Sequence, residues 1–227
     1  MRFSRYSIYY VPDGLLGKFG ASWLGWDIQA RKSVPFLQIQ NTEIDLNQLT
    51  EKPRKYGFHG TLKAPFRLKS CKTEKELIAD FEGFCRNQSS VSSDKLVLQV
   101  INDFLALAPS KQSKQINRLA QNCVTYFERY RAPLNKMELA KRRSKPLTIY
   151  QQEMLSKWGY PYVFKDFKFH LTLTGKIPKT HVDELLSFLG PKIKPIVGDR
   201  FSIKELVLVG EDQEGLFHGL IRRKLKY

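Results

Sequence analysis

The amino-acid sequence predicts an α+β fold built from two similar lobes. Segments with the period-two alternation of strands are interleaved with segments whose apolar residues recur at helical spacing. One order of elements occurs twice: a strand that carries a histidine, then a helix, then two strands that can pair as a hairpin. The next strand begins 37 residues after the histidine in the first half (His59 to Leu96) and 33 residues after it in the second (His170 to Ile203). The two histidines are 111 positions apart, and a repeat period above 100 residues excludes a solenoid and indicates a duplicated lobe.

The chain is expected to form one two-lobed domain over residues 1–227, because no Gly/Ser-rich linker separates the halves. Its approximate parts are a first lobe core at residues 1–110, a basic helical insert at 111–158 and a second lobe core at 159–227. Each lobe core carries one of the two histidine strands.

In the first half, the signals for each element follow one another in order. Tyr and Ile alternate in the first strand, and a turn with apolar residues at helical spacing comes next. A capping-box pair, Thr73 with Glu76, opens the second helix, and a Ser-rich turn precedes two apolar strands. The expected elements are strand 3–11, helix 15–26, a long polar loop at 31–55, strand 56–64, helix 73–85 and the hairpin strands 96–101 and 104–108.

The second half begins with a helix that is apolar on one face and carries Lys and Arg on the other. Two shorter helices follow, and a Gly-Tyr-Pro break ends this region. Alternation then returns in the second histidine strand, before an amphipathic helix and two strands joined by an acidic turn. The expected elements are helix 116–127, short helices around residues 138 and 152, strand 167–174, helix 182–189 and strands 201–209 and 216–225.

The composition is that of a globular chain. Of the 227 residues 42% are apolar and 12% aromatic, which excludes wholesale disorder. No apolar run approaches the ~18 residues of a membrane span, and no signal-peptide pattern follows the basic N-terminal residues. The three cysteines are far apart, which argues against a disulfide framework and a cysteine zinc site. We therefore expect a cytoplasmic monomer with no membrane partner.

The net charge of +16 points to a phosphate-bearing partner. Residues 111–145 hold ten basic and two acidic residues, so about half of the net charge lies in 35 residues. Solvated helix faces in a lysine-rich protein explain these numbers equally well. The charge is therefore consistent with a small phosphate-containing substrate and, as a second candidate, with RNA. It does not identify the partner.

Two short strings share the pattern His-x-Thr-Leu, at residues 59–62 and 170–173. Alternate residues of a strand share a face. His59 and Thr61 therefore point to one side of their strand, and His170 and Thr172 do so in the second copy. One such string is weak evidence, because a histidine among apolar residues is usually structural. Two copies in matching halves, using two of only four histidines, favour a paired function.

These residue types suit the cleavage of a phosphodiester. One group must take a proton from the attacking hydroxyl or water, another must give a proton to the leaving oxygen, and imidazole can do either. The hydroxyls of Thr61 and Thr172 can bond the non-bridging oxygens, and Lys63 can add a positive charge. No cofactor is needed for this chemistry. No metal is expected either, since the sequence has no HExxH motif and no Cys/His ligand cluster.

Further candidate residues rest on alternation alone. On the first strand Arg5 and Tyr9 share a face, which lies in the cleft if the bulkier opposite face packs on helices. A solvated edge arginine and a surface tyrosine explain the same pattern. Arg131, Arg142 and Arg143 of the basic insert either clamp a phosphate or belong to a solvated helix face.

The paired His-x-Thr strings resemble the two-histidine (2H) phosphoesterase superfamily and, within it, the branch described as phosphonate metabolism proteins. The matching strings run from the first strand to the second histidine strand, and the region of His218 matches less well. They are RY at 5–6, IY at 8–9, WLG at 23–25, YGFHGTLKAPF at 56–66, RAPL at 131–134 after Phe127, ELAKRR at 138–143, WGYPY at 158–162 and FKFHLTLTG at 167–175.

The resemblance implies a bilobal fold of two antiparallel sheets that face a central cleft, with helices outside and one His-x-Thr string from each sheet. It also implies metal-independent hydrolysis or transfer at a cyclic phosphodiester of a small nucleotide or ribose phosphate. His59 and His170 would be the catalytic acid and base, in an order that stays open. The frequent proximity of genes of this branch to phosphonate-degradation genes suggests a cyclic ribose phosphate as substrate.

Three functions remain open on the sequence. The first is a metal-independent cyclic phosphodiesterase acting on a small nucleotide or ribose phosphate. The second is a 2H enzyme that processes RNA ends, which requires a continuous basic track leaving the cleft. The third is a non-catalytic module that binds a nucleotide or RNA and retains the cleft.

Overall fold

The computed structural model describes residues 3–39, 44–144 and 146–227. Residues 40–43 of the expected 31–55 loop and Lys145 of the basic segment lie outside the described residues. The strands are β1 Arg5–Tyr10, β2 Trp26–Asp27, β3 Lys32–Ser33, β4 Gly60–Phe66, β5 Val91–Asp94, β6 Leu96–Ile101, β7 Phe104–Pro109, β8 Leu171–Thr172, β9 Arg200–Ile203, β10 Glu205–Glu211 and β11 Phe217–Lys224. The helices are α1 Gly14–Leu24, α2 Leu46–Arg54, α3 Glu74–Arg86, α4 Lys114–Tyr126, α5 Lys136–Arg143, α6 Ile149–Trp158 and α7 Val182–Ile193.

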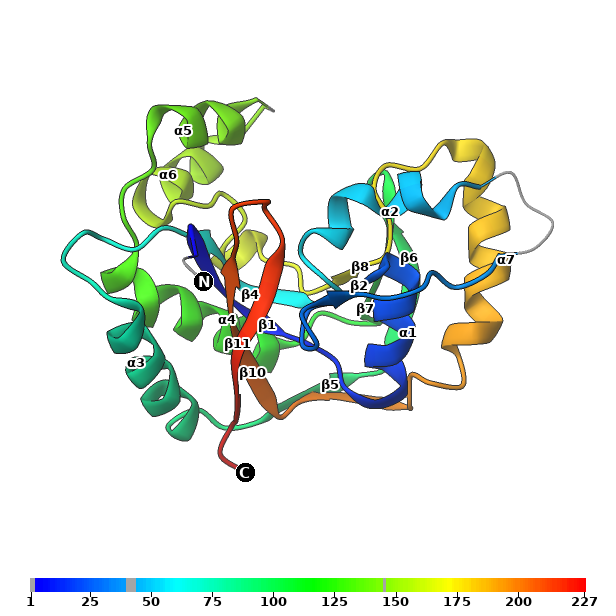
Figure 1. The fold of residues 1–227 in the computed structure, drawn as a ribbon, viewed down its shortest axis with the longest axis horizontal. Coiled ribbons are helices and arrows are strands. Elements are labelled where there is room, and N and C mark those ends of the chain that lie inside the picture. The colour runs from blue at the N-terminus through cyan, green and yellow to red at the C-terminus, as the bar shows by residue number, and fades with distance from the viewer. Residues whose placement is uncertain (1–2, 40–43, 145) are drawn as a thin grey trace.

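Seven of these strands form one antiparallel sheet in the order β11-β10-β1-β4-β8-β7-β6 (Figure 1). The expected α+β class, with antiparallel strands and helices outside, is confirmed. The two histidine strands, β4 and β8, are neighbours in the middle of the sheet. They are joined through the single pair Gly60↔Leu171, so the two expected sheets meet along this short contact and form one.

The strands of each half of the sheet come from both halves of the chain. Strands β6 and β7 follow the first histidine, yet β7 pairs with β8, and β10 follows the second histidine, yet it pairs with β1. The sheet therefore crosses the expected lobe boundaries at residues 110 and 159. Strands β5 and β9, which hold the same place in the two repeats, pair with each other in a separate small sheet. Alternation predicts strands but not their partners, which depend on long-range packing.

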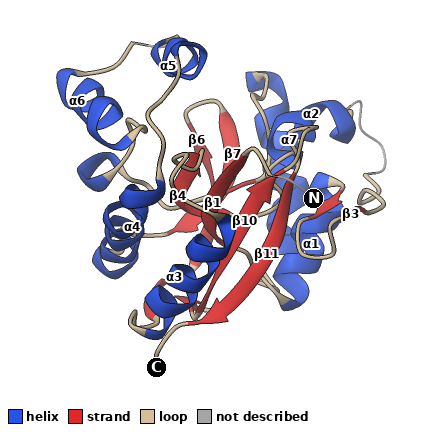
Figure 2. Ribbon diagram, turned by 60° about the vertical axis from the view of Figure 1, so that its left-hand side comes forward, coloured by secondary structure: helices blue, strands red, loops and turns tan. Residues whose placement is uncertain are grey.

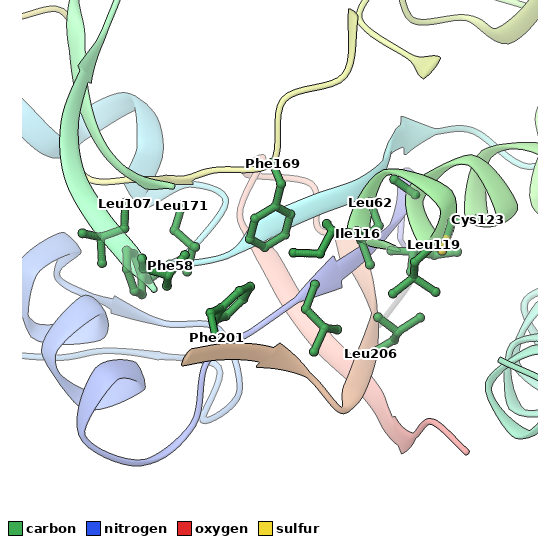
Figure 3. Close-up of a cluster of buried hydrophobic side chains, with 14 of the residues drawn as sticks. Phe58, Leu62, Leu107, Ile116, Leu119, Cys123, Phe169, Leu171, Phe201 and Leu206 are labelled. Carbon is green, nitrogen blue, oxygen red and sulfur yellow. The ribbon is translucent and has the colours of Figure 1, made fainter. Parts of the chain in front are cut away.

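Helices cover the sheet on both sides of the central pair (Figure 2). Helix α3 packs near β10 and β11 and α4 near β4, while α7 packs near β6. The main core lies between these layers and includes Leu62, Phe169, Leu171 and the apolar face of α4 (Figure 3). A smaller apolar cluster packs around Tyr9 and consists of Tyr9, Val11, Trp26, Ile28, Val207, Val209 and Phe217.

Local signals explain most of the helices. The Thr73 hydroxyl accepts from the Glu76 amide and the Glu76 carboxylate accepts from the Thr73 amide, so the predicted capping box is present at α3. Helix α4 buries the apolar face that its spacing predicts. The expected loop at 31–55 is wrong where α2 forms. That helix is capped by Asp45 and buries only Leu46, Thr50 and Pro53, too few residues to leave a periodic signal.

Three predicted strands differ in extent from those observed. The strand expected at 56–64 begins only at Gly60, so His59 precedes it, and the strand expected at 167–174 pairs only at Leu171–Thr172. The strand expected at 201–209 is divided into β9 and β10. In the part of the chain that the structure describes, no helix has both the length and the apolar character needed to cross a bilayer.

Candidate active site

The two His-x-Thr strings lie side by side at the centre of the sheet. Gly60 faces Leu171 across the β4–β8 contact. In an antiparallel pair, continuing this register by one residue in each direction sets His59 opposite Thr172 and Thr61 opposite His170. Residues opposite each other have Cα atoms about 4.5–5.5 Å apart. Two imidazoles and two hydroxyls thus occupy one small area of the sheet, although the histidines are 111 positions apart in sequence.

The backbone holds both imidazoles in the same way. Nδ1 of His59 donates to the carbonyl of Gly57 at 2.8 Å, and Nδ1 of His170 donates to the carbonyl of Lys168 at 2.8 Å. Because a carbonyl can only accept, Nδ1 carries the proton in each ring. In the neutral rings Nε2 is therefore the basic nitrogen. In His59 this atom lies 2.9 Å from the hydroxyl of Thr61, which can donate to it.

A cavity of about 660 Å³ opens beside the two strings. His59 and Thr172 line it. The other lining residues come from the end of α2 and the residues after it, the β6–β7 turn, the loops after α5 and α6, and the segment after β8. These further lining residues are Lys52, Pro53, Tyr56, Gly57, Asn102, Asp103, Phe104, Pro146, Tyr162, Thr174, Gly175 and Lys176. The cavity is thus bounded by aromatic rings and by both ammonium and carboxylate groups, which suits a small polar organic molecule.

Burial lowers the pKa of both histidines. The pKa of His59 falls to about 4, mainly because its ring is desolvated, and the nearby His170 lowers it further. The hydrogen bond with Gly57 opposes this shift. The pKa of His170 is also lowered by burial. Both rings are therefore mostly neutral at pH 7 in the absence of an anion.

Gly60 allows the two strands to approach. A Cβ placed on Gly60 would meet the ring of Phe169 at 2.5 Å, so the ring occupies the space that a side chain would need. Phe169 precedes His170, and its buried ring belongs to the main core. The contact between Gly60 and Phe169 therefore fixes the separation of the two histidine-bearing segments.

The structure separates Lys63 from the histidines. Its ammonium donates to the carbonyl of Val124 at 2.9 Å and to Glu128 at 3.2 Å, at the end of α4. The site is buried, and desolvation lowers the pKa of Lys63 to about 8 although Glu128 opposes the shift. An ammonium beside the last carbonyls of a helix is favourable.

Arg5 and Tyr9, both on β1, have different partners. Arg5 forms a bidentate ion pair with Glu211 of the neighbouring strand β10. Tyr9 is fully buried, with its ring stacked on the imidazole of His59. Of the predicted site residues, His59 and Thr172 line the cavity. Among the described residues that line it, Thr61, His170, Arg5, Tyr9 and Lys63 do not occur.

The arginines of the basic insert make contacts within the protein. Arg131 pairs with Glu128 at 2.6 Å and donates to the carbonyl of Lys157. The guanidinium of Arg142 lies 4.7 Å from the centre of the Tyr160 ring.

Sequence reasoning missed the carbonyls of Gly57 and Lys168, and also the cavity residues Tyr56 and Tyr162. Comparison of the two strings offers a signal for the carbonyls. Both strings extend to Phe-His-x-Thr-Leu, so the positions two residues before each histidine are equivalent. In the described ranges, no three His, Cys, Asp or Glu side chains come together as they would around a metal ion.

Comparison with known proteins gives a family match and several more distant likenesses. A family model described as "protein of unknown function (DUF1045)" matches residues 61–218. A protein of Janthinobacterium sp. (strain Marseille) named ribose 1,5-bisphosphate phosphokinase PhnN is 38% identical over 187 residues, which cover 81% of this chain and 41% of that protein. A protein of the same name from Laribacter hongkongensis (strain HLHK9) is 28% identical over 201 residues, 86% of this chain and 47% of that protein. The chain thus spans less than half the length of these curated relatives.

Two solved structures resemble the chain over nearly its whole length. The protein TT0787 of Thermus thermophilus has a TM-score of 0.48 at 12% identity, with 98% of both chains covered. LigT of E. coli, solved in complex with NADP+, has a TM-score of 0.44 at 13% identity, with 100% of both chains covered. At this level of similarity nothing about the chemistry of this chain follows from them.

Proposed function

The chain belongs to the DUF1045 family, and from its site we propose that it is a metal-independent phosphodiesterase that opens a cyclic phosphodiester of a ribose phosphate or small nucleotide. One observation carries the proposal. Thr61 and Thr172 lie on the paired strands β4 and β8, His59 and His170 directly precede the paired residues Gly60 and Leu171, and Nδ1 of both imidazoles donates to the backbone. The two Nε2 atoms are then the groups available for proton transfer at a shared phosphate.

In the proposed reaction, one Nε2 takes a proton from the attacking water while the water oxygen bonds to phosphorus. The bond from phosphorus to one ring oxygen breaks, and its electron pair stays on that oxygen, which receives a proton from the other Nε2. Each proton transfer of this kind typically contributes ~10²–10⁴-fold to the rate. When the phosphate binds, the hydroxyl of Thr61 would turn from Nε2 of His59 to a non-bridging oxygen, which frees this nitrogen for proton transfer. The hydroxyls of Thr61 and Thr172 would then both donate to the non-bridging oxygens and hold the phosphorus in line.

The proposed substrate class rests on the cavity and on the relatives. A cavity of about 660 Å³ is large enough for a sugar phosphate or a mononucleotide. The two curated relatives are named for a kinase of ribose 1,5-bisphosphate. This chain matches less than half of each, so the kinase activity is not carried over. The name supports a ribose phosphate as the compound that the family handles.

The test is a panel of cyclic ribose phosphates, 2′,3′-cyclic nucleotides and RNA ends, assayed in EDTA with the wild type, His59→Ala and His170→Ala. His181→Ala is the matched control, because its imidazole lies at the start of α7 outside the cavity lining. We expect turnover of at least one cyclic substrate in EDTA, a loss of ~10²–10⁴-fold in each site variant, and no loss in the control. Undiminished turnover in both site variants would refute the proposal.

The same panel separates the alternatives. A non-catalytic binding module would bind a nucleotide or RNA with unchanged affinity in both alanine variants and would turn over none of the substrates. An enzyme of RNA ends would prefer RNA, and its turnover would fall steeply with added salt because phosphate contacts release counterions. Opening of a small cyclic phosphate should depend only weakly on salt.

A further inference from the structure

The two histidines differ in what covers their rings. The ring of Tyr9 stacks on the His59 imidazole, with the ring centres 3.7 Å apart and the planes 24° from parallel. The ring centre of Phe104 lies 5.6 Å from that of His170, with the planes tilted by 49°. Among the residues that the structure describes, an aromatic ring therefore stacks on a face of the His59 imidazole and none stacks on that of His170.

Tyr9 is fixed firmly beneath His59. It lies on β1 opposite Thr61 of β4, and its side chain has no exposed surface. Its ring also contacts Phe217 at 5.9 Å and belongs to the small apolar cluster with Val207 and Val209. A residue with no exposed surface cannot touch a substrate in the cavity, so Tyr9 can affect the reaction only through the residues that it contacts, and His59 is the one on which its ring stacks.

We propose that Tyr9 is a positioning residue, and that its ring keeps His59 neutral and oriented so that His59 takes the proton from the attacking water while His170 gives a proton to the leaving oxygen. This assignment rests on the proposed function. It turns two histidines with the same backbone hydrogen bond into a base and an acid with separate roles.

The physical reason lies in the solvation of the ring. A stacked aromatic ring excludes water from one face of the imidazole, which disfavours the imidazolium ion. This agrees with the lowering of the pKa of His59 to about 4, for which burial is the main cause. His170 lacks the stacked cover. When a phosphate anion binds, its charge favours the imidazolium form of His170, which can then donate from Nε2.

Other groups that face His59 from the surrounding elements do not account for its neutrality. The ring centre of Tyr56, after α2, lies 6.2 Å from that of His59 and is tilted by 36°. Lys52 lines the cavity from α2, and Lys176 pairs with Asp103 of the β6–β7 turn at 3.0 Å. His170 contributes repulsion, but burial is the larger cause.

The proton balance of one turnover is closed. His59 Nε2 gains the proton of the attacking water, and His170 loses its Nε2 proton to the leaving oxygen. His59 then releases its proton to solvent and His170 takes one up, which restores both rings. The product is a phosphomonoester, and no oxidant, reductant or further reactant is required.

The test follows the titration of each imidazole by NMR in the protein without substrate. The variants are Tyr9→Phe, which keeps the ring, and Tyr9→Leu, which removes it. Val209→Ala is the matched control, since it removes apolar contact from the same cluster. We expect the His59 midpoint to stay in place in Tyr9→Phe and Val209→Ala and to rise by about one unit or more in Tyr9→Leu. The His170 midpoint in the same spectra should not move.

The titration midpoint of His59 in the two Tyr9 variants decides whether the Tyr9 ring keeps His59 neutral. An unchanged His59 midpoint in Tyr9→Leu, or an equal shift in Tyr9→Phe, would overturn the proposal. If Tyr9→Leu fails to fold, a shift in Tyr9→Phe alone still contradicts a role for the ring. With the substrate from the panel, the acidic limb of kcat/KM should move upward with the His59 midpoint in Tyr9→Leu. The titration needs no substrate, so its result stands even if the proposed function fails.

Discussion

At the scale of single residues, the backbone sets the tautomer of each histidine and the packing sets its charge. The same bond from Nδ1 to the carbonyl two residues earlier occurs in both strings, at Gly57 and at Lys168. Burial lowers the pKa of both rings, and the ring of Tyr9 stacks on that of His59. The two equivalent strings therefore differ in how their histidines are packed.

Protonation of His59 should make the stability of the protein fall in mild acid. Its pKa is about 4 when folded and about 6.5 when unfolded, so between these values the unfolded chain binds the extra proton. Stability thus rises with pH through this window and is lost as the pH falls from about 6.5 towards 4. Between pH 7 and pH 5 we expect the wild type to lose about 1–2 kcal/mol more than His59→Gln, measured by urea unfolding. Equal losses in both proteins would contradict a buried, neutral His59.

The core of the site could be predicted from the sequence, and its surroundings could not. Period-two alternation places His59 with Thr61 and His170 with Thr172, because both strings lie in extended chain. The same alternation placed Lys63 beside them, but Lys63 reaches the end of α4 instead. The alternation of residues in a strand does not show which helix end will lie near one of its side chains.

At the scale of elements, the site depends on the short contact between β4 and β8. The two strands share a single residue pair, and the ring of Phe169 fills the space above Gly60. Their separation therefore rests on the absence of one side chain. Elements with strong local signals, such as α3 and α4, could be predicted, whereas the polar helix α2 could not.

Substitution of Gly60 by Ala should impair the reaction without touching a reacting group. The added Cβ would overlap the Phe169 ring, which is held in the core and has little freedom to move. We expect a loss of about 1–3 kcal/mol in the free energy of unfolding and a fall in kcat of at least about tenfold. Gly83→Ala, on α3, is the control, since its nearest recorded neighbour is at 3.9 Å. A fully active Gly60→Ala would show that the spacing of the strands is unimportant.

The ion pair between Lys63 of β4 and Glu128, which follows α4, should prove structural. In Glu128→Gln the ammonium of Lys63 stays buried without a carboxylate, whereas in Lys63→Met the carboxylate of Glu128 keeps Arg131 at 2.6 Å. We therefore expect Glu128→Gln to lose about 2–4 kcal/mol at pH 7 and Lys63→Met to lose less. Both should retain kcat within a few-fold. Normal stability with abolished turnover in Lys63→Met would instead make Lys63 a ligand of the substrate.

At the scale of the whole molecule, the two sequence repeats do not form two separate sheets, because one sheet combines strands of both. The sheet takes β10 and β11 from the end of the chain to complete the half that holds β1 and β4. It takes β6 and β7 from the first half to complete the part that holds β8. The order of elements could be predicted from the sequence, but this exchange could not, because the repeats give no signal of which strands pair.

The exchange predicts that neither lobe core is stable alone. A fragment of residues 1–110 would lack β10, the partner of β1, and β8, the partner of β7. Its strands would then expose unpaired edges and apolar side chains. We expect no cooperative thermal transition for the fragment by circular dichroism, in contrast to the full chain. A cooperative transition of the fragment would show that residues 1–110 fold without β8 and β10.

A crystal structure with inorganic phosphate bound would show directly whether one phosphate group contacts both imidazoles. We expect a single anion whose oxygens lie within about 3.2 Å of Nε2 of His59 and of Nε2 of His170. An anion bound to one imidazole only, or two Nε2 atoms that point to separate places, would contradict this expectation.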